Sequence, residues 1–121
     1  MTSQGRANRI AQQIKEDLAT MLLFEVGDPR LEGVYITDVN VDRELAYANI
    51  FVSTLEGSVR SEEVMEGLAR AKGFLRSQLA QRIQLRSFPH LRFSWDPTPE
   101  NAERIERLLD SLHKDEQADD E

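Results

Sequence analysis

The 121 residues of this chain suffice for one domain with a single hydrophobic core, and a composition of 40% hydrophobic and 31% charged residues excludes wholesale disorder. The absence of cysteine excludes disulfides and thiolate metal sites. No apolar run is long enough to cross a bilayer, and the polar start lacks the apolar region of a signal peptide, so we expect a cytoplasmic protein.

The net charge of −7 is distributed unevenly along the chain. Residues 1–92 carry 12 basic and 12 acidic side chains, whereas residues 93–121 carry 3 basic and 10 acidic ones. Within the balanced part, residues 1–15 and 67–95 contain basic side chains and no acid. Charge separated in this way predicts a basic face on an acidic protein.

The first predicted element is an amphipathic helix from about Arg6 to Phe24. Apolar residues recur along it at the spacing of one helical face. The segment Gly27-Asp28-Pro29-Arg30 ends this helix, because proline disfavours helical geometry at the preceding residue and glycine supports a turn.

A β-hairpin is predicted next. Residues 34–41 alternate between apolar and polar side chains, and the alternation changes phase near Thr37-Asp38, which predicts a β-bulge. Residues 46–53 present an apolar side on each face of a strand. A turn at residues 42–44 is expected to join the two strands.

Two helical segments with a bend between them are predicted to follow. Ser61 and the two glutamates after it are typical of a helix start, with Ser61 as the cap. Gly73 interrupts the apolar stripe that begins at Val64. We therefore predict a kink at Ala71-Lys72-Gly73 and a second helical segment from Phe74 to Gln84.

A strand and a helix complete the predicted elements. Apolar residues alternate with polar ones in the strand, which places Leu91 and Phe93 in the core. Thr98 is the expected cap of the last helix, with Pro99 at its first position.

These elements, with helices covering one side of a small sheet, predict an α+β two-layer domain. We expect this single domain to occupy residues 1–113. The remaining residues, 114–121, are mostly acidic and are expected to form a disordered tail.

No catalytic or metal-binding pattern is found in the sequence. The two histidines, His90 and His113, lie far apart without metal-ligand spacing, so we expect both at the surface. G-x-S-x-G turns and glycine-rich phosphate loops are absent. We therefore expect a protein that is not an enzyme and that holds no cofactor and no metal. The tail could collect divalent cations loosely, but a solvated tail is favoured.

The acid-free basic segments are the candidate binding surface. For any single arginine a solvated position is the simpler interpretation, but six bases without an acid in residues 67–95 favour phosphate binding by part of the set. Phe74 could stack on a base, although a core position is favoured. The candidate binding residues are Arg6, Arg9, Lys15, Arg70, Lys72, Arg76, Arg82, Arg86 and Arg92.

From Gly5 to about Leu109 the sequence resembles ribosome-binding factor A, a family of bacterial small-subunit maturation proteins. Five motifs in order carry the resemblance: Gly5-Arg6-x-x-Arg9-Ile10, Asp28-Pro29-Arg30-Leu31, Leu45-Ala46-Tyr47-Ala48, Ala71-Lys72-Gly73-Phe74-Leu75-Arg76 and Leu85-Arg86-x-x-Pro89-x-Leu91-x-Phe93-x-x-Asp96.

The resemblance implies a type II K-homology-like fold with an added C-terminal helix and a bend at the Ala-x-Gly position. It also implies binding to the immature small ribosomal subunit and its rRNA during late rRNA processing and cold adaptation. K-homology domains that bind single-stranded RNA have a G-x-x-G loop, and this chain has Ala71-Lys72-Gly73 in its place. This difference favours side-chain contacts with the phosphates of folded rRNA. Glu44 stands where the family usually has aspartate.

We expect a monomeric binding factor whose nine candidate basic residues dock on rRNA by shape rather than by base reading. The alternative is a protein-interaction module that contacts ribosomal proteins or an assembly GTPase. If about six phosphates are neutralised, the logarithm of affinity falls with the logarithm of salt concentration at a slope of about −4 to −5. Arg76→Glu with Arg86→Glu is then expected to abolish binding.

Overall fold

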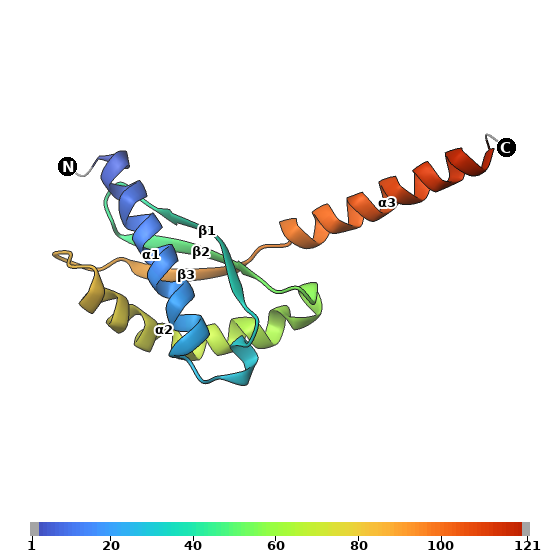
Figure 1. Cartoon of the computed structure of the whole chain (residues 1–121). Helices are drawn as coiled ribbons and strands as arrows, with labels where there is room; N and C mark the ends of the chain where they lie inside the picture. Colours follow the sequence, from blue (N-terminus) through green and yellow to red (C-terminus); the bar gives the residue numbers. More distant parts are fainter. Residues whose placement is uncertain (1–2, 120–121) are drawn as a thin grey trace.

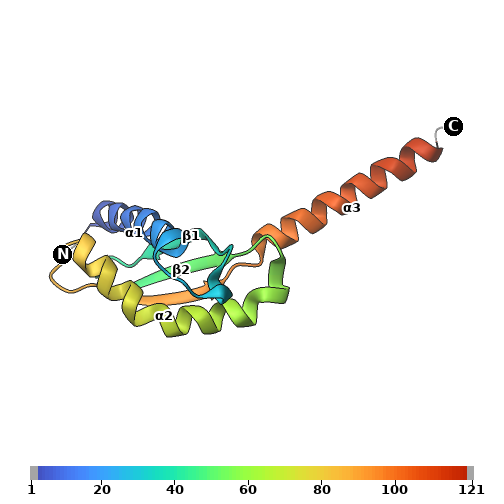
Figure 2. The same ribbon diagram turned by 60° about the horizontal axis from the view of Figure 1, so that its bottom comes forward.

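The computed structural model describes the backbone of residues 3–119 and the side chains of residues 3–113. A three-stranded sheet carries α1 and α2 on one face, while α3 extends away from this body (Figures 1 and 2). The predicted α+β two-layer architecture is confirmed. Its helices and strands are α1 (Gln4–Phe24), β1 (Tyr35–Val41), β2 (Tyr47–Ser53), α2 (Ser61–Arg82), β3 (His90–Trp95) and α3 (Thr98–Asp119), with 3₁₀ helices at Pro29–Leu31 and Gly57–Arg60.

The strand order is β1-β2-β3, with β1 and β2 antiparallel and β2 and β3 parallel. The register of β1 against β2 shifts between Ile36 and Asp38, which confirms the predicted bulge. Asp42 closes the hairpin, because its carboxylate accepts the backbone N–H groups of Ala46 at 2.8 Å and Tyr47 at 2.9 Å. The parallel pair is connected through α2, as a parallel pair requires a long crossover.

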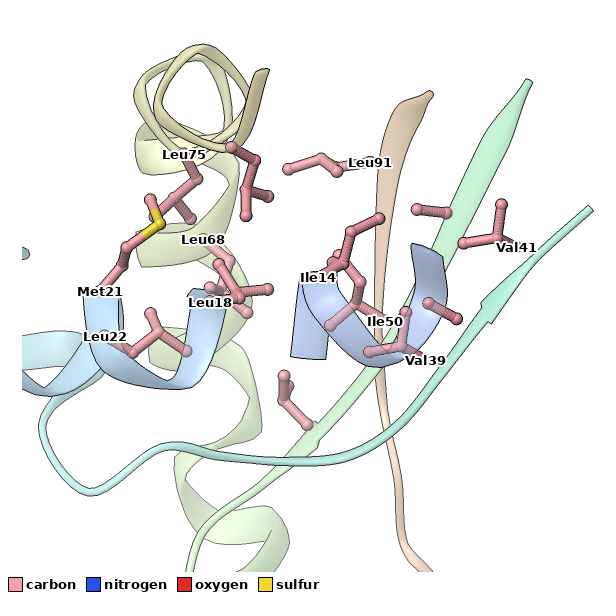
Figure 3. Packing of buried hydrophobic residues seen from close by; sticks show 14 of the residues in the cluster. Ile14, Leu18, Met21, Leu22, Val39, Val41, Ile50, Leu68, Leu75 and Leu91 are labelled. Atoms are coloured by element: carbon pink, nitrogen blue, oxygen red, sulfur yellow. The ribbon is translucent and has the colours of Figure 1, made fainter. Parts of the chain in front are cut away.

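One hydrophobic core lies between the two helices and the sheet (Figure 3). α1 buries one face because its apolar residues return every three or four positions, and β2 buries every second residue because strand side chains alternate between faces. Fully buried side chains drawn in Figure 3 include Ile14, Leu18, Met21, Ile50, Leu68, Leu75 and Leu91.

α2 begins differently from the prediction. Ser61 is its first residue and not its cap, because the 3₁₀ helix Gly57–Arg60 runs directly into it and Arg60 already has helical backbone angles. The guanidinium of Arg60 instead donates to Glu63 at 2.6 Å and to the carbonyl oxygen of Glu32 at 2.7 Å. Arg60 thereby ties the start of α2 to the segment before β1.

The two predicted helical segments after Ser61 are one helix that ends at Arg82. Its ribbon changes direction partway along (Figures 1 and 2). A kink located at Ala71-Lys72-Gly73 stays a prediction. Phe74 is 49% exposed, so the favoured core position was wrong: the buried stripe of α2 runs through Leu75 and Leu79, and successive residues of a helix point in different directions.

α3 starts one residue earlier than predicted. The carbonyl oxygen of Pro97 accepts the Asn101 N–H at 3.0 Å, and Asp96, rather than Thr98, caps the helix by accepting the Thr98 N–H at 2.9 Å. α3 leaves an apolar stripe uncovered, with exposed fractions of 51–60% at Ile105, Leu108, Leu109 and Leu112.

We expected residues 114–121 to be a disordered tail, but α3 continues through Asp119. Residues 120–121 lie outside the described part of the chain. Once a helix has formed its first turn, each further residue adds a hydrogen bond at low entropic cost, and Lys, Glu, Gln and Ala are good helix formers. This explains how an acidic segment can prolong the helical backbone of α3 as far as Asp119.

Gly67 on α2 sits against the 3₁₀ helix Pro29–Leu31. A Cβ atom at this position would lie 2.9 Å from Leu31 Cδ2 and 3.3 Å from Arg30 Cβ. Leu31 is only 2% exposed, so its side chain has little room to move. The absence of a side chain at Gly67 therefore allows this close approach.

Gly67→Ala is expected to lower the free energy of unfolding by about 1–3 kcal/mol, because overpacking outweighs the better helix propensity of alanine. Gly73→Ala is the matched control on the same helix. Nothing lies within 4 Å of a Cβ atom there, so a gain of up to about 1 kcal/mol is expected. Urea denaturation measures the free energy of unfolding of both variants. Equal changes in the two variants would contradict a steric conflict at Gly67.

Asp96 fastens the start of α3 to the sheet. Its carboxylate accepts the Thr37 hydroxyl at 2.6 Å and the Thr98 N–H at 2.9 Å, and these hydrogen bonds, the Thr37 bond foremost, lower the pKa of Asp96. Since the folded state then binds the proton more weakly than the unfolded chain, the stabilisation is present above about pH 4 and is lost as pH falls through the folded pKa.

Asp96→Asn is accordingly expected to lower the Tm at pH 7 and to reduce the further loss of Tm between about pH 4 and pH 2.5. Thermal melts over this pH range check the result. Asp110→Asn, at an exposed carboxylate of α3 outside the core, is the control. If the Tm of the Asp96→Asn protein falls with pH as steeply as that of the wild type, the Asp96 carboxylate does not provide this stabilisation.

Candidate nucleic-acid interface

Three segments that are distant in sequence meet at one end of the molecule. They are the first turns of α1, the hairpin turn before β2 and the loop between α2 and β3, at the left of Figure 1. Because β2 and β3 are parallel, the start of β3 lies beside the start of β2, with His90 opposite Tyr47. The hairpin turn and the loop are therefore neighbours.

Two grooves adjoin at this end. The larger, of about 740 Å³, is lined by Arg6, residues 44–47, residues 85–88 and His90. The smaller, of about 350 Å³, lies between α1 and the end of α2, and its lining includes Arg9 and Arg82. Both share Arg6 and Leu85. We call the surface around these grooves the basic end, defined by Arg6, Arg9, Arg82, Arg86 and Arg92.

Three arginines of the basic end project without an internal partner. The side chains of Arg6, Arg9 and Arg86 are exposed and make no hydrogen bond or ion pair with other described residues. A guanidinium in this state presents all its donors to an external group, and its planar fork matches a phosphate or a carboxylate.

Arg92 lies on the sheet face that the helices leave open. Its Cζ atom is 3.4 Å from the centre of the Tyr47 ring, and the His90 ring is tilted against the same tyrosine at a centroid distance of 5.8 Å. Stacking on the tyrosine fixes the guanidinium plane while its edge stays available for hydrogen bonds. Tyr47 and His90 were missed as site residues, because only the parallel register places them together.

Arg82 is partly neutralised within the fold. Its guanidinium donates to the Glu25 carboxylate, at 2.7 Å from Oε2, and this hydrogen bond raises the pKa of Arg82. Both side chains are about one-third exposed, so the pair is accessible to solvent. An external phosphate would have to compete with Glu25 for this guanidinium.

The side chain of Arg76, by contrast, makes hydrogen bonds within the fold. Its guanidinium donates to the carbonyl oxygens of Phe88 at 2.6 Å and Pro89 at 3.0 Å, and both of these residues are buried. The side chain thereby holds the loop that leads into β3. The donors of Arg76 are therefore used within the fold and are not directed to a ligand.

The remaining candidates lie outside the basic end. Lys15 lines a separate groove between α1 and β1. Arg70 acts electrostatically on Asp28, which places it near the 3₁₀ helix Pro29–Leu31. Lys72 is exposed on α2 and lines neither groove of the basic end. The nine basic residues therefore do not share one surface.

Other kinds of site are not found within the described residues. No three His, Asp or Glu side chains among residues 3–113 come together in a way that could hold a metal ion. No helix in the described part of the chain combines the length and the apolar character needed to span a membrane.

Comparison with known proteins agrees with this architecture. The family model for Ribosome-binding factor A matches residues 6–109. A curated protein of that description from Aromatoleum aromaticum is 34% identical over 114 residues, which cover 94% of this chain and 90% of the relative.

Two sets of coordinates for the factor from Thermus thermophilus extend the comparison. The crystal structure of ribosome-binding factor A from Thermus thermophilus matches with a TM-score of 0.66 at 25% identity, covering 74% of this chain and 93% of that one. A homology model of the Thermus thermophilus factor, fitted into a cryo-EM map of a complex between the 30S subunit and the factor, matches with a TM-score of 0.60 at 27% identity, covering 73% of this chain and 91% of that one. The shared fold is the K-homology-like one that the motifs implied. The chain belongs to the ribosome-binding factor A family.

Proposed function

We propose that this protein is a ribosome biogenesis factor that binds the immature small ribosomal subunit and its rRNA through the basic end. It assists late rRNA processing and maturation, including at low temperature, and acts in the cytoplasm as a monomer without a cofactor or a reaction of its own. The observation that carries the proposal is the convergence of unpaired arginines from α1 and the α2–β3 loop. The 30S complex of the Thermus thermophilus relative supports the choice of partner.

The charge distribution orients the protein on its partner. The basic end presents Arg6, Arg9, Arg86 and Arg92 to phosphates, and contacts of this kind fix position without reading bases. The acid excess lies in residues 93–121, which contain α3, and α3 points away from the body (Figure 1). A polyanion repels that helix, so the basic end faces the rRNA and α3 faces outward.

The salt dependence of binding tests this function. Four cationic side chains that neutralise phosphates predict that log affinity for the small subunit falls with log salt at a slope of about −3 to −4. This is shallower than the sequence-based value, because Arg76 and Arg82 are engaged within the fold. Sedimentation of the protein with precursor subunits across a salt series gives the slope, and a flat response would refute rRNA binding.

The apolar stripe of α3 favours a second function. Four large apolar side chains around Ile105 and Leu109 are more than half exposed, which suits a protein partner such as a ribosomal protein or an assembly GTPase. Ile105→Glu with Leu109→Glu separates the two functions. Docking through rRNA predicts wild-type affinity for the subunit, whereas docking through a protein predicts loss of binding.

A further inference from the structure

We propose that the larger groove of the basic end holds one unpaired nucleotide of rRNA, with its base against Tyr47 and His90 and its phosphate on Arg6 or Arg86. This inference rests on the proposed function and adds to it a class of ligand. It assigns base stacking to a surface for which the sequence indicated phosphate contacts alone.

The size of the groove suits a single nucleotide. Its volume of about 740 Å³ lies within the range of roughly 300–1,000 Å³ that is common for small-ligand sites. The walls come from the first turns of α1, the hairpin turn and the α2–β3 loop. The bases of a duplex are paired and stacked, so a duplex offers such a groove only its backbone.

The lining combines the two kinds of group that a nucleotide needs. Arg6 and Arg86 have no internal partner among the described residues and offer charged donors to a phosphate, and Glu44 is the only acid in the lining. Tyr47 and His90 offer aromatic rings, and stacking on such rings accepts any base.

The tyrosine is held in place for this role. Arg92 covers the Tyr47 ring at 3.4 Å from its centre, yet 37% of the residue remains exposed. The backbone N–H of Tyr47 is fixed by Asp42, and Arg76 fixes the opposite wall through the carbonyls of Phe88 and Pro89. Both walls are thus built before a ligand arrives, which reduces the entropy lost on binding.

The groove differs from the usual single-strand site of K-homology domains. None of the residues Ala71-Lys72-Gly73, which stand where those domains have the G-x-x-G loop, lines it. The nucleotide is therefore held by side chains at the end of the sheet and not by the backbone in the middle of α2.

A matched pair of tyrosine variants tests the groove. Tyr47 and Tyr35 are both the first residue of a strand and both 37% exposed, but only Tyr47 lines this groove. Fluorescence anisotropy of the 121-residue chain is measured with a single-stranded ten-nucleotide RNA and with a blunt-ended RNA duplex of ten base pairs, which has no unpaired nucleotide. The wild-type protein is expected to bind the single strand about tenfold more tightly than the duplex.

Tyr47→Leu is expected to weaken single-strand binding about tenfold and duplex binding less than twofold, because stacking on one base is lost. Tyr35→Leu is expected to retain wild-type affinity for both RNAs. If the Tyr47→Leu protein binds the single strand as tightly as wild type does, or if the wild-type protein binds the duplex as tightly as the single strand, the inference is overturned.

Crosslinking of the wild-type protein provides a measurement that does not depend on the stability of a variant. A single-stranded RNA carrying 5-iodouridine is expected to crosslink to Tyr47 or His90, and crosslinks confined to other parts of the chain would overturn the inference.

The double variant Arg6→Glu with Arg86→Glu distinguishes a failure of the nucleotide site from a failure of the proposed function. If it weakens subunit binding while Tyr47→Leu has no effect, only the nucleotide site fails; if it has no effect, both proposals fail.

Discussion

Arg6→Glu with Arg86→Glu is expected to weaken binding to the precursor small subunit by about 100-fold or more near 0.1 M salt. Each substitution removes a charge-assisted contact with phosphate and adds a repelling carboxylate at the same point. The slope of log affinity against log salt should also become shallower, by about 2, because two fewer counterions are released. Sedimentation with purified subunits over a salt series measures both quantities.

Arg70→Glu with Lys72→Glu is the matched control, since it makes the same change in net charge on the exposed side of α2. Neither residue lines the grooves of the basic end, so only a weak long-range effect is expected, less than about fivefold. If this pair weakens binding as strongly as the first pair, the contact lies along α2, and the basic end is not the interface.

Arg76→Met is expected to lower the free energy of unfolding by about 2–4 kcal/mol. The substitution keeps an unbranched apolar stem but removes the donors that satisfy the carbonyl oxygens of Phe88 and Pro89. Hydrogen bonds from a charged donor contribute about 1.5–3 kcal/mol each, and a buried acceptor left without a partner adds a desolvation penalty. Urea denaturation at pH 7 measures the change.

Arg86→Met, at an exposed arginine ten residues further along the chain, controls for the loss of a positive charge and should change stability by less than about 0.5 kcal/mol. Wild-type stability of the Arg76→Met protein would show that the loop before β3 needs no such support. If the loss is found, reduced RNA binding by an Arg76→Glu protein reports damage to the fold, and Arg86→Glu alone reports contact with RNA.

The location of the structural elements could be predicted well because it depends on local pattern. The recurrence of Ile10, Ile14 and Leu18 places α1, and the change of phase near Thr37-Asp38 locates a bulge in β1. Helix ends were less predictable: Ser61 has the chemistry of a cap, but a preceding 3₁₀ turn made the cap unnecessary. Arg60, the last residue of that turn, donates to carbonyl oxygens 28 and 30 positions earlier, and a local pattern does not show such contacts.

The basic character of the candidate site could be predicted from the sequence, but the residues that form it could not. The sequence indicated two basic, acid-free stretches, residues 1–15 and 67–95, and the structure brings only some of their basic residues to the basic end. The sequence shows where each charged side chain lies along the chain, but it does not show which group that side chain contacts in the folded protein. Arg76 satisfies backbone carbonyls and Arg82 pairs with a glutamate that follows α1, and both contacts form only on folding.

The sequence by itself determined the succession of helices and strands, the separation of charge along the chain and the family, because these properties reside in local periodicity, composition and short motifs. Only the tertiary structure decided which basic side chains remain available to a polyanion and which aromatic rings lie beside them. The physical reason is that the parallel pairing of β2 and β3 sets Tyr47 beside His90 across 43 positions of chain, and no local pattern encodes that register.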